Sequence, residues 1–153
     1  MTTRADIVAC ARTYVGTPFG HQGRQKGMLL DCVGLPLMVA GELGLKDRFE
    51  NLIHGGLYTK YTAQPLGNFV KDTAARHLVR KPIDQIAPGD VLALRVVSAA
   101  CHVGMVGDSP EGLTLIHAQN GAGEKCVEHL LDDQWRSRIA GVFSFPEVNQ
   151  EEE

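Results

Sequence analysis

The chain has no excess of basic residues. Its 15 lysines and arginines are outnumbered by 18 aspartates and glutamates, which gives a formal net charge of -3. Arg76, Arg80 and Lys81 form only a small basic cluster. Proteins that bind nucleic acid usually carry a basic patch or stripe on one face. The composition therefore argues against nucleic acid as a general partner.

Long apolar runs are also missing. No stretch approaches the roughly 20 apolar residues that span a bilayer, and residues 1–6 lack the apolar core of a signal peptide. We therefore expect a protein that is made in the cytosol and does not enter a membrane. The 153 residues are 44% hydrophobic and 22% charged, an ordinary globular composition. We expect one domain over residues 1–147 and an acidic, frayed tail over residues 148–153.

The most informative stretch covers residues 29–40, where Asp31 and Cys32 precede an apolar run of helical length. Asp31 as N-cap would accept a backbone N–H of the first turn, and Cys32 would lie where the helix dipole favours a thiolate. A lowered pKa makes a thiol nucleophilic near neutral pH. Two alternatives stay open. Pro36 cannot donate to the Cys32 carbonyl, so the helix can instead start at Gly34 or the next residue, and a buried structural cysteine fits the same stretch.

Helical patterns occupy the first half of the chain and short β-rich runs the second. A capping box that joins Thr3 and Asp6 predicts a helix over residues 4–15, with Cys10 as a core thiol. Helices followed by strands are typical of an α+β fold in which the helices lie on one side of an antiparallel sheet. We expect further helices over residues 32–43 and 67–79, a loop over 46–65, a turn at Pro88-Gly89-Asp90, strands over 91–97, 102–106, 113–117, 126–130 and 141–145, and a helical turn over 131–136.

A cysteine nucleophile needs a general base, and the base needs a group that orients it. Of the six histidines, His102 opens one predicted strand and His117 closes the next. Two imidazoles on neighbouring strands can approach each other, and one can fix the tautomer of the other. The nucleophile, base and orienting group would then be Cys32, His102 and His117. Either histidine could instead be an ordinary structural residue of its strand.

A zinc site is the competing interpretation of the same histidines. Cys101 and His102 are consecutive, so in a strand they would point to opposite faces. The sequence has neither a CxxC nor an HxxxH pair, so the ligand spacing is poor. We expect no metal and no organic cofactor, and we expect the four cysteines of a cytosolic product to be free. The zinc ligands would come from Cys101, His102, His117, Cys126 and His129.

Four motifs, taken in order, resemble those of the NlpC-type cysteine peptidases, papain-like enzymes that cut bacterial cell-wall peptides. The resemblance covers roughly residues 5–147. Residues 17–22 and 135–143 are similar to the branch encoded in tailed-phage and gene-transfer-agent tail clusters. The motifs are Asp31-Cys32-Val33-Gly34-Leu35, Pro88-Gly89-Asp90-Val91-Leu92, His102-Val103-Gly104-Met105-Val106 and Ile116-His117-Ala118.

The resemblance implies a papain-like α+β domain in which Cys32 is the nucleophile, His102 the base and His117 the third polar residue. Asp31 helps to shape the substrate cleft in this family. The substrate would be the D-glutamyl–diaminopimelate link of peptidoglycan stem peptides. Two alternatives remain: a non-enzymatic tail-tip component that assembles with phage tail proteins in a virion, and an acyltransferase or a peptidase that acts on a protein outside the cell wall.

Two positions depart from the family pattern. Val33 stands where many relatives carry serine, which removes a polar contact beside the nucleophile. Phe19 stands where the family usually has a tyrosine whose hydroxyl helps to hold substrate or the oxyanion. We expect His21, two residues further along, or Tyr14 to take over that part of substrate binding.

Overall fold

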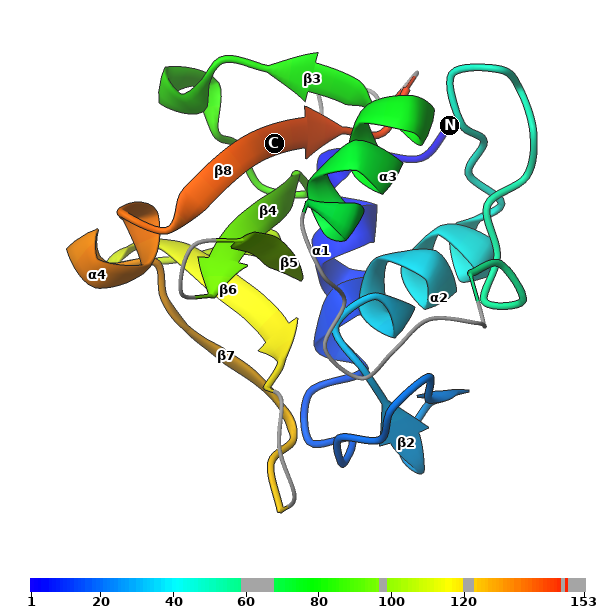
Figure 1. Ribbon diagram of the computed structural model, residues 1–153, viewed down its shortest axis with the longest axis horizontal. Helices are drawn as coiled ribbons and strands as arrows, with labels where there is room; N and C mark the ends of the chain where they lie inside the picture. The colour runs from blue at the N-terminus through cyan, green and yellow to red at the C-terminus, as the bar shows by residue number, and fades with distance from the viewer. Residues whose placement is uncertain (59–67, 97–98, 120–122, 147, 149–153) are drawn as a thin grey trace.

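The computed structural model describes residues 1–58, 68–96, 99–119, 123–146 and 148. Three helices lie on one side of an antiparallel sheet (Figure 1), so the predicted α+β class is confirmed. The helices are α1 (Arg4–Arg12), α2 (Gly34–Leu43), α3 (Phe69–His77) and α4 (Asp133–Arg136), with a 3-10 turn η1 at Ile83–Gln85; the strands are β1 (Arg24–Gln25), β2 (Leu29–Leu30), β3 (Val79–Lys81), β4 (Val91–Val96), β5 (Ala99–Ser109), β6 (Gly112–Ala118), β7 (Cys126–Leu130) and β8 (Ile139–Ser144).

The main sheet has six strands in the order β3-β8-β4-β5-β6-β7, all antiparallel to their neighbours. Strands β4 to β7 form the predicted meander, and β8 returns to pair with β4. The sequence did not predict the edge strand β3 or the small β1-β2 hairpin. Each of these strands has only two or three residues, which is too short for an alternating pattern to stand out.

The two faces of the sheet bury different side chains. On the face covered by α1, α2 and α3, the strands contribute a first core that includes Val103, Met105 and Phe143. On the opposite face, a second apolar cluster forms around Leu94 and Leu115 and packs against Trp135 at the end of the sheet. Successive side chains of a strand point to opposite faces, so neighbouring residues of β4, β5 and β6 serve different cores.

The predicted helices are confirmed in place but not in every boundary. The capping box is present: the Thr3 side chain accepts from the Asp6 backbone N–H at 3.0 Å, and Asp6 accepts from the Thr3 N–H at 2.9 Å. Helix α1 ends at Arg12 rather than at residue 15, because Thr13 already caps it. Helix α2 begins at Gly34 rather than at Cys32 and ends at Leu43, followed by the C-cap Gly44, whose left-handed φ of 67° suits glycine.

A buried ion cluster attaches the predicted turn before β4 to the rest of the fold. Asp90 is fully buried and bonds to Arg4 Nη1 at 2.8 Å and to Lys81 Nζ at 2.7 Å. Because both cations face one carboxylate, these contacts connect α1, β3 and the start of β4. Removing one partner of such a buried pair typically costs about 3–5 kcal/mol.

Some predicted segments lie partly outside the described residues. Residues 46–58 contain no helix or strand of the sheets, as expected for a loop, whereas residues 59–67 lie outside the described part. Val148, which we assigned to the tail, is buried in the first core, and residues 149–153 lie outside the described part. Among the described helices, none is both long and apolar enough to cross a membrane.

Candidate active site

Two of the predicted site residues are hydrogen-bonded to each other. His102 near the start of β5 and His117 near the end of β6 are both buried, and His102 Nε2 lies 2.8 Å from His117 Nδ1. Gly104 provides the space: a Cβ at this position would lie 3.3 Å from the Cβ of His117 and 2.5 Å from a methyl of Leu115. The expected contact between the two histidines is therefore present.

A third histidine extends this contact. His117 Nε2 lies 2.8 Å from His129 Nε2, and His129 Nδ1 lies 2.9 Å from the carbonyl oxygen of Leu130. We call His102, His117 and His129 the three-histidine chain. From the sequence alone, His129 was a candidate residue only for the alternative zinc site. The strand register could have identified it, because His117 pairs with Val127 and His129 lies two residues further on the same face of β7.

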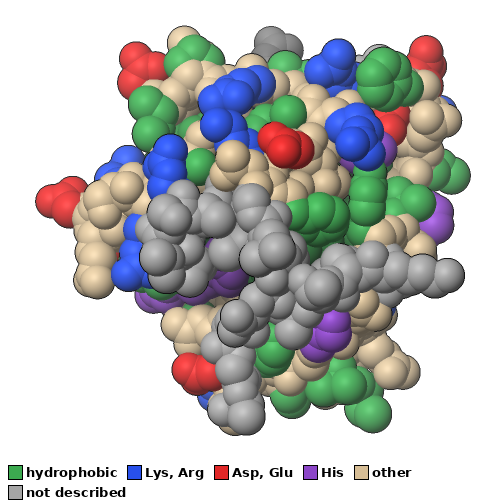
Figure 2. Space-filling view, viewed as in Figure 1, with side chains coloured by type: hydrophobic (Ala, Val, Ile, Leu, Met, Phe, Trp, Pro, Cys, Tyr) green, Lys and Arg blue, Asp and Glu red, His purple; other side chains and the backbone are tan. Residues whose placement is uncertain are grey.

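The indole of Trp135, in α4, packs beside all three rings. Its ring centre lies 4.9 Å from that of His117, 5.6 Å from that of His129 and 6.3 Å from that of His102. Histidine side chains, drawn in purple, reach the surface over the region of β6 (Figure 2). The three-histidine chain therefore runs from a buried strand pair toward the surface, with an aromatic wall along one side.

Burial keeps the inner two imidazoles neutral. Loss of hydration, together with the nearby positive charge of Arg138, lowers the pKa of His102 to about 4. Loss of hydration also lowers the pKa of His117 to about 3, with a contribution from its two histidine neighbours. Both rings are thus neutral at pH 7, with one of their two nitrogens protonated. A neutral imidazole is the form that can accept a proton from a thiol.

Cys32 is half-buried in the short segment before α2, which corresponds to the alternative helix start. Asp31 is buried and accepts from the Gly34 N–H at 2.8 Å, from the Gln22 N–H at 2.8 Å and from Arg24 Nη1 at 2.9 Å. Asp31 therefore still satisfies an N–H of the first helical turn, although it stands further from the helix than predicted. These bonds fix the backbone on both sides of Cys32.

Backbone bonds bring the Cys32 segment to the sheet end that carries the histidines. Cys126, at the start of β7, pairs with Ala118 of β6 and donates its N–H to the carbonyl of Thr17 at 2.8 Å. Pro18, next along the chain, accepts from the Leu30 N–H at 2.9 Å. Cys32 follows Leu30 by two residues, and Ala118 follows His117 directly.

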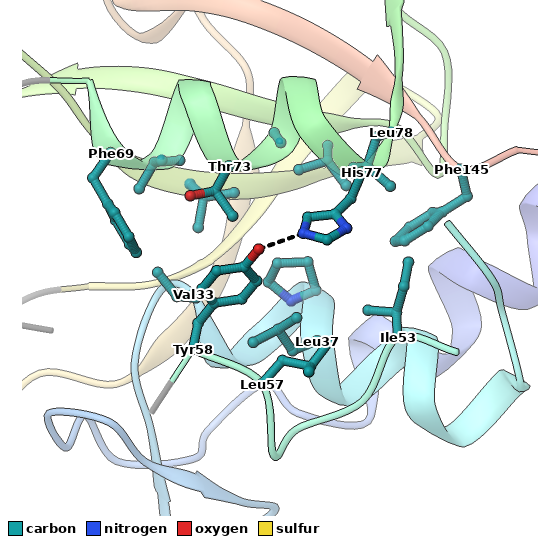
Figure 3. Close-up of a pocket in the computed structure, with 15 residues that line it drawn as sticks. Val33, Leu37, Ile53, Leu57, Tyr58, Phe69, Thr73, His77, Leu78 and Phe145 are labelled. Carbon is teal, nitrogen blue, oxygen red and sulfur yellow. Dashed lines mark hydrogen bonds between the residues drawn. The ribbon is translucent and has the colours of Figure 1, made fainter. Parts of the chain in front are cut away.

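A cavity of about 80 Å³ lies between the helices and the sheet, on the helix side of β5. Val33, next to Cys32, and Val103, next to His102, both line it. The wall of the cavity is mostly apolar. Its polar side chains are Thr73, Tyr58 and His77, and the last two are hydrogen-bonded to each other (Figure 3). Val33 therefore contributes an apolar surface where the family pattern has a serine hydroxyl.

The remaining predicted substrate residues lie in different environments. His21 is exposed and Phe19 is half-buried in the same loop, with its N–H bonded to the Glu124 carbonyl at 2.8 Å. Tyr14 is fully buried, and its hydroxyl donates to Glu42. Since a fully buried side chain cannot contact a bound substrate without rearrangement, we leave Tyr14 out of the proposed site.

The other cysteines differ from Cys32 in their surroundings. Burial raises the pKa of Cys10 to about 11 and that of Cys126 to about 12. Cys10, Cys32 and Cys126 are free thiols, and the side chain of Cys101 lies outside the described part. Within the described residues, no group of three or more His, Cys, Asp or Glu side chains is arranged to hold a metal ion.

Comparison with solved structures identifies the fold. The chain superposes on the NlpC/p60 domain of the peptidoglycan hydrolase SagA with a TM-score of 0.61 and 22% identity, over 94% of this chain and 100% of that one. An NLP/P60 family protein of Staphylococcus aureus, described as similar to lipoprotein, matches with a TM-score of 0.57 and 16% identity. That match covers 96% of this chain but 42% of the other.

An N-acetylmuramoyl-L-alanine amidase from Bacteroides uniformis matches with a TM-score of 0.50 and 12% identity, over 92% of this chain and 96% of that one. No protein-family model matches the chain, and no curated protein matches it either. The chain thus has the NlpC/p60 fold, as the motifs predicted.

Proposed function

We propose that this chain is a cysteine peptidase or amidase that hydrolyses peptidoglycan stem peptides, with Cys32 as nucleophile, His102 as general base and His117 as the residue that orients it. The observation that supports this most strongly is the 2.8 Å bond between two buried, neutral imidazoles on adjacent strands of an NlpC/p60 fold. The placement of Cys32 beside that end of the sheet supports it further.

The proposed reaction proceeds in two steps. His102 takes the proton of the Cys32 thiol, and the sulfur attacks the amide carbonyl of the substrate. The resulting tetrahedral oxyanion would be stabilised by the backbone N–H of Cys32, and one such donor lowers a barrier by roughly 2.7–4 kcal/mol. His102 then gives the proton to the leaving amine. Water, activated by His102, attacks the thioester, releases the acid product and restores the thiol.

The finer substrate assignment rests on the sequence motifs. Within stem peptides, the D-glutamyl–diaminopimelate link is the bond that the resemblance favours. The similarity of residues 17–22 and 135–143 to the tail-cluster branch supports a phage-derived peptidase that assembles with tail proteins. Val33 lines the cavity with an apolar side chain, which supports a substrate contact beside Cys32 that differs from the one a serine would make.

The deciding experiment is incubation of the purified protein with defined muropeptides, followed by mass spectrometry of the products. We expect release of a fragment cut between D-glutamate and diaminopimelate by the wild type. Cys32→Ala should abolish the cut while leaving the melting temperature within a few degrees of the wild type. Cys10→Ala is the matched control, because it removes a thiol that burial makes unreactive.

The other interpretations predict different products. A structural tail component would leave every muropeptide intact, and tail assembly would be unaffected by Cys32→Ala. An acyltransferase would produce a mass that corresponds to an amine adduct in place of a hydrolysis product. Intact muropeptides after incubation with an excess of folded wild-type protein would contradict the proposed function.

A further inference from the structure

The outer end of the three-histidine chain determines where its protons lie. The carbonyl oxygen of Leu130 can only accept a hydrogen bond, and it lies 2.9 Å from His129 Nδ1. His129 Nδ1 therefore carries a proton. In a neutral imidazole the other nitrogen is then an acceptor, so Nε2 of His129 accepts.

This assignment passes inward through both hydrogen bonds. His129 Nε2 accepts at 2.8 Å from His117 Nε2, which must carry the proton of that ring. His117 Nδ1 is then an acceptor and receives the proton of His102 Nε2, also at 2.8 Å. His102 is left with an unprotonated Nδ1. Three neutral rings in this arrangement satisfy each bond with one donor and one acceptor.

We propose that His129, fixed by the Leu130 carbonyl, is a positioning residue that sets the tautomers of His117 and His102 so that Nδ1 of His102 is the basic nitrogen. The catalytic consequence rests on the proposed function, in which that nitrogen faces the thiol of Cys32. The tautomer order itself does not depend on activity, because it follows from the three hydrogen bonds.

The surroundings favour three neutral imidazoles whose tautomers are set by the outermost ring, that of His129. His102 and His117 are buried, whereas His129 is half-buried at the surface end. Trp135 packs within 6.3 Å of all three rings and offers no carboxylate that could stabilise an imidazolium. Arg138 adds a positive charge near His102, which also opposes protonation. The backbone carbonyl of Leu130 is then the group that fixes the donor and acceptor in each hydrogen bond of the three-histidine chain.

The tautomers can be measured directly by NMR on protein with 15N-labelled histidine. Ring nitrogen shifts distinguish a protonated from an unprotonated nitrogen in each ring. We expect the Nε2–H form for His102 and His117 and the Nδ1–H form for His129 at pH 7. His129→Arg places a donor-only group opposite His117 Nε2, which should reverse both inner rings to the Nδ1–H form.

Three variants separate this role from a merely structural one. His129→Gln should keep the order, because its amide nitrogen can donate to the Leu130 carbonyl while its oxygen accepts from His117. We expect its kcat for muropeptide hydrolysis to stay within about 3-fold of wild type and that of His129→Arg to fall by about 100-fold or more. Gln134→Arg is the matched control: it adds the same charge on an exposed side chain next to Trp135, and it should keep the tautomer order and the activity.

If His129→Arg does not fold, His129→Leu removes both hydrogen bonds without adding a charge, and the inner rings should then populate both tautomers. Unchanged inner tautomers in folded His129→Arg or His129→Leu would overturn the proposal. Wild-type protein that shows the expected order but cuts no muropeptide would contradict the proposed function and leave the positioning role supported. Retained hydrolysis in a His129→Arg protein with reversed tautomers would overturn the assignment of Nδ1 as the base.

Discussion

Within the described residues, hydrogen-bonded chains run through His102, His117 and His129 and through His77, and they end differently. The three-histidine chain on the sheet ends at the neutral carbonyl of Leu130. On the helix side, His77 of α3 bonds through Nδ1 to Asp47 Oδ2 at 2.8 Å and through Nε2 to the hydroxyl of Tyr58. The second chain therefore ends at a buried carboxylate.

The different endings suit different tasks. Asp47 also accepts from the backbone N–H groups of Phe49 at 2.8 Å and Asn51 at 3.0 Å, and its pKa is held below the usual range mainly by the bond from His77. This chain, which ends at the carboxylate of Asp47, connects the loop of residues 46–58 to α3. A carboxylate would stabilise an imidazolium, whereas a carbonyl leaves His102 neutral and able to take a proton. The comparison supports a structural task for the chain of His77 and, under the proposed function, a catalytic task for the three-histidine chain.

The largest expected effect separates the two tasks by activity. His102→Gln should lower kcat for muropeptide hydrolysis by about 100-fold or more, because it removes the general base. His77→Gln should leave kcat within a few-fold of wild type but lower the free energy of unfolding by about 1–3 kcal/mol, since it leaves buried polar partners unsatisfied. Steady-state kinetics and urea denaturation measure the two effects. Equal losses of activity in the two variants would remove the distinction between the chains.

The second prediction separates the chains by pH. The pKa of His102 is about 4 in the folded protein and near 6.5 when exposed, so between these values the unfolded chain binds a proton that the folded chain excludes. Stability should therefore fall as the pH decreases from about 6.5 to 4, by on the order of 3 kcal/mol for this residue. The lowered pKa of Asp47 acts in the same direction but in a lower pH window, because its stabilising effect is lost only as the pH falls below about 3.8.

Urea denaturation at several pH values between 7 and 4.5 measures this dependence. His102→Gln should reduce the loss of unfolding free energy that accompanies the decrease in pH. The control His54→Gln, at an exposed residue, should leave this loss unchanged. A wild-type stability that is constant from pH 7 to 4.5 would contradict the neutral, buried state of the chain.

Much of this arrangement could be predicted from the sequence, and the exceptions have physical reasons. His102 and His117 stand at the ends of two short β-rich runs that follow each other along the chain, so their contact was predictable. His129 needed the strand register, which depends on the length of the turns and not on local pattern. Tyr14 illustrates a different limit, since its spacing within the amphipathic pattern already fitted the core and the family analogy suggested a substrate role.

The start of α2 shows how two local signals compete. Asp31 predicted a cap and Pro36 predicted a defect in the first turn. The structure satisfies both, because the helix begins at Gly34 and Asp31 still reaches its N–H from three residues away. The sequence could not choose between these starts, since the choice depends on Arg24 and Gln22, which occupy the other lone pairs of Asp31.

The third prediction extends the comparison to the thiols. Cys10 and Cys126 lie in the helix-side core, where burial raises their pKa values to about 11 and about 12. Their thiolate fractions at pH 7 are correspondingly small, so iodoacetamide should label Cys32 at least about 10-fold faster than either. Peptide mass spectrometry over a time course measures the rates. Comparable rates at all three thiols would count against a reactive Cys32.

The smallest expected effect concerns the loop that precedes the nucleophile. Phe19 lacks the hydroxyl that the family pattern places at this position, and the hydroxyl of Tyr14 already bonds to Glu42. His21 is exposed in the same loop, one residue before Gln22, whose N–H bonds to Asp31 at 2.8 Å. The His21 ring belongs to the loop that bonds to Asp31 and so fixes the backbone around Cys32. His21 is therefore a better candidate than Tyr14 for a polar substrate contact.

His21→Ala should therefore lower kcat for a muropeptide by about 10-fold, the low end of what one polar catalytic contact contributes. Phe19→Tyr should be tolerated in the wild type and should recover part of the loss in the His21→Ala protein, because it restores a hydroxyl at the family position. His54→Ala, another exposed histidine, is the control and should have no effect on kcat. If the wild type cuts muropeptides and His21→Ala has the same kcat, no side chain of this loop replaces the missing hydroxyl. A backbone donor near Cys32 would then be the group to test.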